Sequence, residues 1–277
     1  MTNVTRIKAL IRNLSKEANI EAEVLLRKFM IERLLERISV SNYRENFILK
    51  GGTLITSIVG VEARSTMDVD VTITGQNVTS EWLSQMFEEI LEIPTGDDVK
   101  MRLCEIVEIR EQAVYPGFRL SIEAILEKTR QILKVDITTG ESITPKEIDY
   151  HYKLLFEDRE INLRAYNLET ILAEKLETIM SRGESNTRMR DFYDIYILST
   201  TQKYNEDLFK LAYKNTIVRR GTVEASNSLD NVIDALEHSL LMKGYWERYS
   251  KQYPYANNLS WEKIIKAIRL LEGLVVE

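Results

Sequence analysis

The stretch from residue 47 to residue 73 constrains the fold of this chain most. A short apolar run at 47–49 leads into Lys50-Gly51-Gly52-Thr53, where the glycines allow a sharp turn between a strand and a helix. A short helix is expected over 54–59. Residues 68–73, Asp-Val-Asp-Val-Thr-Ile, then alternate polar and apolar side chains, as a half-buried strand does. The stretch therefore predicts strand, turn, helix and strand in succession.

In the rest of the chain, the predicted secondary structure changes from helical to mixed and back to helical. Residues 4–46 have the apolar spacing of a helical hairpin, and a helix is expected over 81–91. Further strands are expected over 98–110, 117–128 and 131–138, and around 151–156 and 160–164. Helices are expected over 168–181, 190–199, 205–215, 228–241 and 260–275. The order predicts an α/β (α+β) core with a mixed sheet, N-terminal helices and a helical C-terminal lobe, divided into domains 1–166 and 167–277.

Composition excludes several classes of protein. The net charge of −6 and the pI near 5.3 argue against a general basic surface for nucleic acid, although one local basic patch could still bind RNA. Cys104 is the single cysteine, so neither an intrachain disulfide nor a zinc cluster with the two histidines is expected. The charged N-terminal sequence is unlike a signal peptide, and no run reaches about 20 apolar residues, so a cytoplasmic protein without a membrane span is expected.

The first candidate site is the acidic strand. Asp68, Asp70 and Thr72 share one face, which places the two carboxylates about 7 Å apart at a rise of about 3.3 Å per residue. Two like charges at this separation repel each other, and a divalent cation removes that cost. Mg²⁺, or Mn²⁺ in its place, suits a few carboxylates, water and nucleotide phosphates. The alternative is a solvated edge strand that carries its acids by chance.

A third carboxylate lies in the sequence Lys-Val-Asp-Ile-Thr-Thr-Gly at 134–140. Asp136 shares a polar strand face with Lys134 and Thr138. If this strand adjoins the strand of Asp68 and Asp70, the three carboxylates could hold two metal ions, one activating the attacking oxygen and the other neutralising the leaving pyrophosphate.

The turn at 50–53 is a candidate phosphate site. Glycines at 51 and 52 let backbone N–H groups at a helix start approach a phosphate, and the Thr53 hydroxyl adds a donor. An ordinary helix-start turn fits these residues equally well, and the Walker A pattern is absent.

The expected helix at 168–181 carries Lys175 inside its apolar stripe, and Arg182 follows seven residues later. A lysine on a buried face is costly unless it is paired or reaches solvent, and a triphosphate would justify it. Asp191 and Asp194 are one helical turn apart and invite pairing with Lys175. Three arginines, Arg182, Arg188 and Arg190, would suit phosphate oxygens. A purely structural ion-pair network is the alternative.

Together these motifs resemble the polymerase-β-like nucleotidyltransferase superfamily, and the set is similar to the AbiEii/AbiGii toxins of bacterial abortive-infection and toxin–antitoxin systems. The resemblance spans about residues 47–200. Its four motifs are Gly52-Thr53 with Asp68 and Asp70, then the sequence at 134–140, then Lys175 to Arg182, then Asp191 to Asp194. Thr53 replaces the serine usual in the family, and the gap from Thr53 to Asp68 is a few residues longer than the family pattern.

The resemblance implies a bilobed enzyme that uses Mg²⁺ and an NTP and has an antitoxin encoded nearby. It also implies nucleotide transfer to an acceptor, tRNA in some members, with a block of translation and a role in phage defence. In this interpretation Asp68 and Asp70 hold the metals, and Asp136 completes the metal site or acts as the base.

The nucleotide would be bound by Gly52 and Thr53, with Lys50, Gly51, Arg182 and Arg190 as further candidates. Lys175 would bind the triphosphate. Asp191, or Asp194 in its place, would orient Lys175 or the nucleotide. The alternatives left open are an NTP-binding regulatory or partner-binding protein without transfer chemistry, and an RNA nuclease. The identity of the NTP and of the acceptor is not readable from the sequence, and neither is the oligomeric state.

Overall fold

The computed structural model describes residues 3–64, 66–75, 77–109 and 117–276. The chain divides into two compact units. The first contains Met1–Glu141 and Ile148–Ala165, and the second contains Ser142–Glu147 and Tyr166–Glu277. The segment Ser142–Glu147 belongs to the second unit because Asn167 donates to the Thr144 carbonyl oxygen at 2.7 Å and the Thr144 N–H donates to the Thr170 hydroxyl at 3.1 Å.

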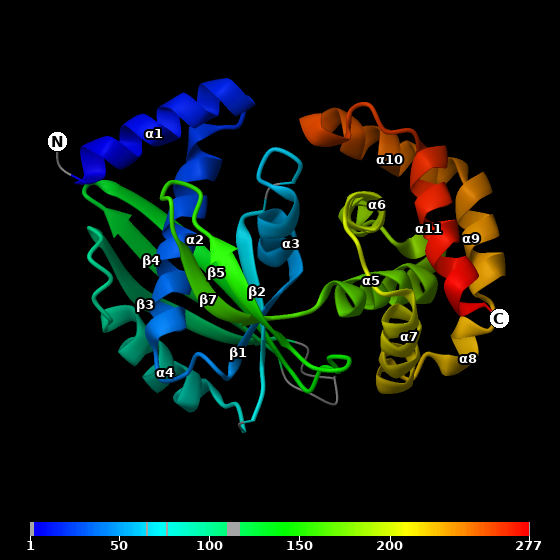
Figure 1. Ribbon diagram of the computed structural model, residues 1–277, viewed down its shortest axis with the longest axis horizontal. Coiled ribbons are helices and arrows are strands. Elements are labelled where there is room, and N and C mark those ends of the chain that lie inside the picture. The colour runs from blue at the N-terminus through cyan, green and yellow to red at the C-terminus, as the bar shows by residue number, and fades with distance from the viewer. Residues whose placement is uncertain (1–2, 65, 76, 110–116, 277) are drawn as a thin grey trace. The chain divides into compact units, whose positions relative to one another are not determined.

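The first unit is built on one mixed sheet (Figure 1). Its described strands are β1 (Phe47–Lys50), β2 (Asp68–Ile73), β3 (Val99–Ile109), β4 (Gly117–Leu126), β5 (Thr129–Thr139), β6 (Ile148–Lys153) and β7 (Glu160–Ala165). They lie in the order β3-β4-β5-β2-β1-β7-β6. The pairs β2–β5 and β1–β7 are parallel, and the other neighbouring strands are antiparallel. This confirms the predicted mixed α/β architecture; position 110 of the predicted strand 98–110 lies outside the described residues.

Helices of the first unit cover the apolar side of the sheet. They are α1 (Asn3–Ala18), α2 (Ala22–Val40), α3 (Gly51–Val59) and α4 (Ser80–Glu92). The alternating strand β2 buries Val69 and Val71 completely or nearly so. On β1, the Phe47 ring meets the Phe87 ring of α4 edge-on, with the ring centroids 5.7 Å apart. α2 packs against β5, β7 and α4. This burial leaves the opposite face of the central strands for polar side chains.

Helix α2 also buries a set of charged side chains. Lys28 donates to the hydroxyl of Tyr152, and the Leu155 N–H donates to both oxygens of Glu32 at 3.1 and 3.2 Å. Burial raises the pKa of Glu32 to about 7, although Lys28 and the Leu155 N–H oppose the shift. The pKa of Lys28 is lowered, chiefly by burial. The helix therefore carries ionisable groups whose charged forms are disfavoured by folding.

The second unit is helical. Its described helices are α5 (Leu168–Arg182), α6 (Met189–Thr201), α7 (Glu206–Arg220), α8 (Val223–Ser226), α9 (Leu229–His238), α10 (Leu240–Gln252) and α11 (Trp261–Val275). The single helix predicted over 228–241 is wrong. The chain breaks at Ser239, whose hydroxyl accepts from the Met242 N–H and caps the new helix α10, as serine does at helix starts. Among the described residues, no helix is both long and apolar enough to cross a membrane.

Candidate functional site

Four charged residues lie side by side across four neighbouring strands. Lys50 of β1 pairs in register with Asp70 of β2, Asp70 with Asp136 of β5, and Asp136 with Arg119 of β4. We call Lys50, Asp70, Asp136 and Arg119 the charged row. The parallel pairing of β2 with β5 thus places Asp70 and Asp136 on adjacent strands (Figure 1). This adjacency is the condition under which the sequence predicted that the two carboxylates share a site. Asp68 and Lys134 form the next pair on the same face.

The glycine turn positions Asp70. Gly51 has a φ of +59°, and a Cβ atom built there would lie 2.2 Å from Oδ2 of Asp70. The N–H of Gly52 donates to that same oxygen at 3.1 Å. Glycine at 51 is therefore required both by the left-handed backbone and by the closeness of the carboxylate. The turn and the acidic strand, which the sequence treated as two motifs, form one structure.

The second glycine has close neighbours of its own. A Cβ atom on Gly52 would lie 2.6 Å from Oγ1 of Thr66 and 2.9 Å from Nη1 of Arg64. Arg64 is buried and donates to the Gly52 carbonyl oxygen at 2.8 Å. The tight backbone at this turn therefore serves contacts within the protein.

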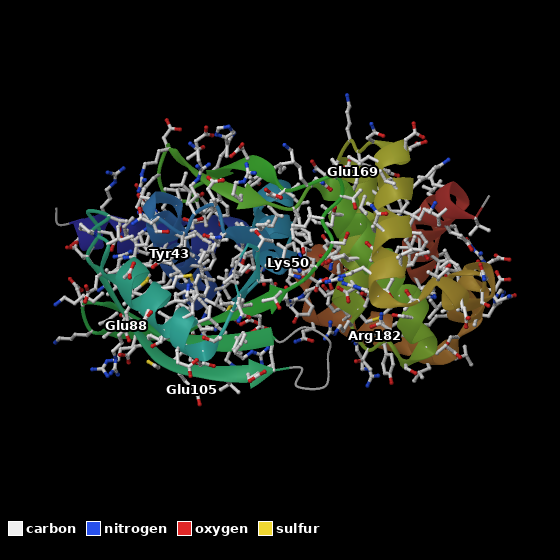
Figure 2. The ribbon with its side chains drawn as sticks, turned by 90° about the horizontal axis from the view of Figure 1, so that it is seen from below. Tyr43, Lys50, Glu88, Glu105, Glu169 and Arg182 are labelled. Carbon is white, nitrogen blue, oxygen red and sulfur yellow. The ribbon has the colours of Figure 1, made fainter. Side chains whose placement is uncertain are left out.

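Burial is the main influence on the ionisation of Asp70. Burial raises its pKa; the Gly52 N–H and Lys50 oppose the shift, and the charges of Asp136 and Asp68 add to it. Lys50, labelled in Figure 2, is buried, with its Nζ 3.5 Å from Oε1 of Glu141. The negative form of Asp70 is thus costly in this environment unless a cation compensates it.

Thr53 makes a contact within the protein that the sequence did not predict. Its side chain is fully buried, and its hydroxyl donates to the carbonyl oxygen of Asp68 at 2.7 Å. The hydroxyl therefore ties α3 to the start of β2 and is not directed at an outside ligand. A phosphate contact from the Thr53 hydroxyl, as predicted from the sequence, would require this bond to break.

Arg119 is the member of the charged row that the sequence analysis missed. Its Nε and Nη2 donate to Oδ1 and Oδ2 of Asp136 at 2.7 and 2.6 Å, a bidentate pair. The short turn at 127–128 between β4 and β5 sets the register that places Arg119 opposite Asp136. That hairpin register is the signal that could have identified Arg119 from the sequence.

The charged row has carboxylate oxygens that could bind a divalent cation, but these residues do not form a complete metal site. Across the described parts of the chain, no three His, Cys, Asp or Glu side chains are grouped so that they could hold a metal ion. In this arrangement Arg119 donates to both oxygens of Asp136, and the three predicted carboxylates are not grouped as a metal site among the described residues. Two adjacent carboxylates still fit Mg²⁺, which binds proteins through one or two carboxylates and completes its shell with water and phosphate oxygens.

The second unit holds the other predicted residues. Lys175 of α5 lies between two carboxylates of α6, with its Nζ 2.7 Å from Oδ1 of Asp191 and 2.8 Å from Oδ2 of Asp194. Asp194 is completely buried, whereas the side chains of Lys175 and Asp191 are 14 % and 17 % exposed. Lys175 and Asp191 are thus the members that a ligand can reach, and Asp194 is the buried support.

The predicted arginine cluster is only partly formed. Arg182, labelled in Figure 2 at the end of α5, is exposed, and so is Arg188. The guanidinium of Arg190 is half-buried and lies 5.5 Å from the centre of the Tyr253 ring, whose hydroxyl it also contacts at 3.4 Å. Arg190 therefore supports a cluster of tyrosines in this unit, and Arg182 stays a candidate for phosphate binding.

Comparisons with known proteins identify a family by sequence and similar folds by structure. The family described as "Nucleotidyl transferase AbiEii toxin, Type IV TA system" matches residues 33–267. The fold is similar to the crystal structure of JHP933 from Helicobacter pylori, with a TM-score of 0.53 and 16 % identity over 92 % of this chain and 93 % of that one. It is also similar to an H. pylori structure described as a "putative nucleotidyltransferase", with a TM-score of 0.50 and 15 % identity over 91 % and 96 % of the two chains. The curated protein sequences gave no match.

Proposed function

Because the chain belongs to the AbiEii nucleotidyl transferase toxin family of type IV toxin–antitoxin systems, we propose that it transfers a nucleoside monophosphate from an NTP to tRNA and thereby blocks translation. The observation that carries this proposal is the pair of adjacent carboxylates, Asp70 and Asp136, beside the glycine turn. Family membership also implies a cognate antitoxin, whose gene product would relieve the block directly or indirectly.

In the first unit, the chain's own residues prepare a cation site for the nucleotide. Asp70 is oriented by the Gly52 N–H, and Asp136 presents a second carboxylate from the neighbouring strand. Asp68, exposed at the start of β2, adds a third negative charge on the same face. A bound Mg²⁺ or Mn²⁺ would neutralise phosphate charge and lower the pKa of the attacking hydroxyl. We propose that Asp136, whose side chain is 22 % exposed, either completes this cation site or accepts that proton.

In the second unit, Lys175 supplies positive charge for the triphosphate. Its two carboxylate partners hold the ammonium in one position. A fixed cation of this kind stabilises the charge that develops on a departing pyrophosphate without reorganising during the reaction. We propose that Lys175 has this role, with Asp191 and Asp194 as the residues that position it.

The test is nucleotide transfer itself. Purified protein is incubated with Mg²⁺, total tRNA and each α-labelled NTP in turn, beside Asp70→Asn and Lys175→Met. The matched controls are Asp158→Asn and Lys266→Met, which remove the same charges from exposed positions of the first and second units. We expect label on tRNA for the wild type and both controls, and at least a hundredfold less for the two site variants.

The other outcomes separate the alternatives. Undiminished transfer by Asp70→Asn or Lys175→Met would refute the assignment of these residues. NTP binding without transfer to any RNA would favour a regulatory protein, and loss of tRNA without added NTP would favour a nuclease.

A further inference from the structure

Arg119 differs from the other cation of the charged row in its freedom to move. Its side chain is 45 % exposed, whereas that of Lys50 is 11 % exposed and lies beside Glu141. Only Arg119 can therefore leave the row by rotating into solvent while the backbone stays in place. The ion pair that holds it is short but partly solvated, and such pairs contribute little net free energy.

The bidentate contact also decides what else Asp136 can bind. Both carboxylate oxygens accept a hydrogen bond from Arg119, and both face its positive charge. With Arg119 in place, the charges of Lys50, Asp70, Asp136 and Arg119 cancel. When Arg119 leaves, the row becomes negative and the two oxygens of Asp136 become available. The row is thus closed to a divalent cation in one arrangement and open to it in the other.

We propose that Arg119 is a displaceable latch, which covers Asp136 in the resting protein and must release it before a divalent cation can bind beside Asp70. The released guanidinium then binds a phosphate group of the incoming NTP, since its fork of donors fits phosphate oxygens as it fits the carboxylate. This inference rests on the proposed function, because it assumes that the acidic pair takes a cation.

The latch is tested by measuring the Mn²⁺ affinity of the protein without nucleotide. Electron paramagnetic resonance reports the fraction of Mn²⁺ that is bound. Arg119→Gln should bind Mn²⁺ about two- to fivefold more tightly than the wild type, because the competing charge is gone. Arg119→Lys should fall between them, since it keeps the charge but loses the fork. The matched control is Arg102→Gln, which removes another exposed arginine of the sheet from its ion pair with a carboxylate, that of Glu123. Glu123 lies about 13 Å along β4 from Arg119 at ~3.3 Å per residue.

A second measurement tests the new partner of Arg119. With Mn²⁺ saturating, Arg119→Gln should bind labelled ATP about tenfold more weakly than the wild type, while Arg102→Gln should be unchanged. Opposite changes in metal and nucleotide affinity are the signature of the latch. A merely structural arginine would weaken both or neither. Thermal unfolding of each variant checks that the fold is kept.

Each other outcome has a definite meaning. If Mn²⁺ binds, and Asp70→Asn abolishes this binding while Arg119→Gln leaves it unchanged, the proposed function stands and the latch is refuted. If Arg119→Gln tightens Mn²⁺ binding but leaves ATP affinity unchanged, the phosphate contact is refuted. If neither the wild type nor Arg119→Gln binds Mn²⁺, both the cation site and the latch are refuted.

Discussion

Replacing Gly51 by alanine should displace the Asp70 carboxylate. The added Cβ would lie 2.2, 2.6 and 2.7 Å from Oδ2, Cγ and Cβ of Asp70, closer than nonbonded atoms approach. Alanine must also adopt the φ of +59° found at Gly51, which costs about 1 kcal/mol. Forcing the carboxylate aside adds about 1–3 kcal/mol. We therefore expect a loss of about 2–4 kcal/mol in the first unit.

Gly221 provides the matched control for this prediction. Its φ of +68° is similar, but a Cβ atom there would meet nothing within 4 Å. Gly221→Ala should thus cost only the conformational part, about 1 kcal/mol. Placing Gly51→Ala in an Asp70→Gly background removes the three clashing atoms, so the alanine should then cost no more than it does at 221.

Hydrogen exchange followed by mass spectrometry is the suitable assay, because it reports each unit separately. Exchange in peptides from β1, α3 and β2 should accelerate about 30- to 1000-fold in Gly51→Ala if it occurs through unfolding of the first unit. Transfer and Mn²⁺ binding should be lost together. The reasoning is refuted if Gly51→Ala costs no more than Gly221→Ala and both activities survive.

Three further predictions test other parts of the structure. Folding favours protonated Glu32, because burial raises its pKa to about 7; this stabilisation is complete below pH 4.5 and lost as the pH rises through 7. The wild type should therefore lose stability relative to Glu32→Gln as the pH rises from 4 to 8, and the difference in their free energies of unfolding should change by up to about 3 kcal/mol. Urea unfolding of both proteins at several pH values measures this difference, and parallel pH dependences would contradict the prediction. Thr53→Val should lower the free energy of unfolding by about 1–2 kcal/mol, because the hydrogen bond to the Asp68 carbonyl is lost. Thr53→Ser keeps the hydroxyl and should keep both stability and transfer. A loss of transfer in Thr53→Val at unchanged stability would instead favour a phosphate contact of the Thr53 hydroxyl. Asp194→Asn should destabilise the second unit by about 3 kcal/mol, because it breaks a buried ion pair. Asp191→Asn, at a more exposed position, should cost less than half of that but should lower the NTP affinity more. Equal effects of the two variants in thermal unfolding and in NTP binding would refute the assignment of Asp194 to support and Asp191 to ligand binding.

The sequence was sufficient for the parts of the fold that depend on local pattern. Alternation at 68–73 and 131–138 predicted two strands with a polar face, and β2 and β5 have that form. The sequence was insufficient where one residue is compatible with two local structures. Ser239 fits the interior of a helix by spacing, but its hydroxyl caps a backbone N–H and divides α9 from α10. Likewise, nothing local indicated that Ser142–Glu147 joins the second unit.

The candidate site was predictable only as separate motifs. The acids at 70 and 136 were identified from residue type and strand face, but their adjacency depends on the pairing of β2 with β5. The glycines were expected to admit a phosphate, yet the nearest atoms belong to Asp70, Thr66 and Arg64. Arg119 was missed because its relation to Asp136 is a matter of hairpin register. Long-range contacts thus decided what each motif is for.

The route of the chain between the two units limits how this protein can be divided or synthesised. The chain passes from one unit to the other after Glu141, returns after Glu147 and leaves again after Ala165. A fragment starting at Tyr166 would lack Thr144, to which Asn167 and Asn215 donate hydrogen bonds. The helical part is therefore not an exchangeable cassette. During translation, six of its residues leave the ribosome ahead of β6 and β7 and must wait for Asn167 before they acquire their partners.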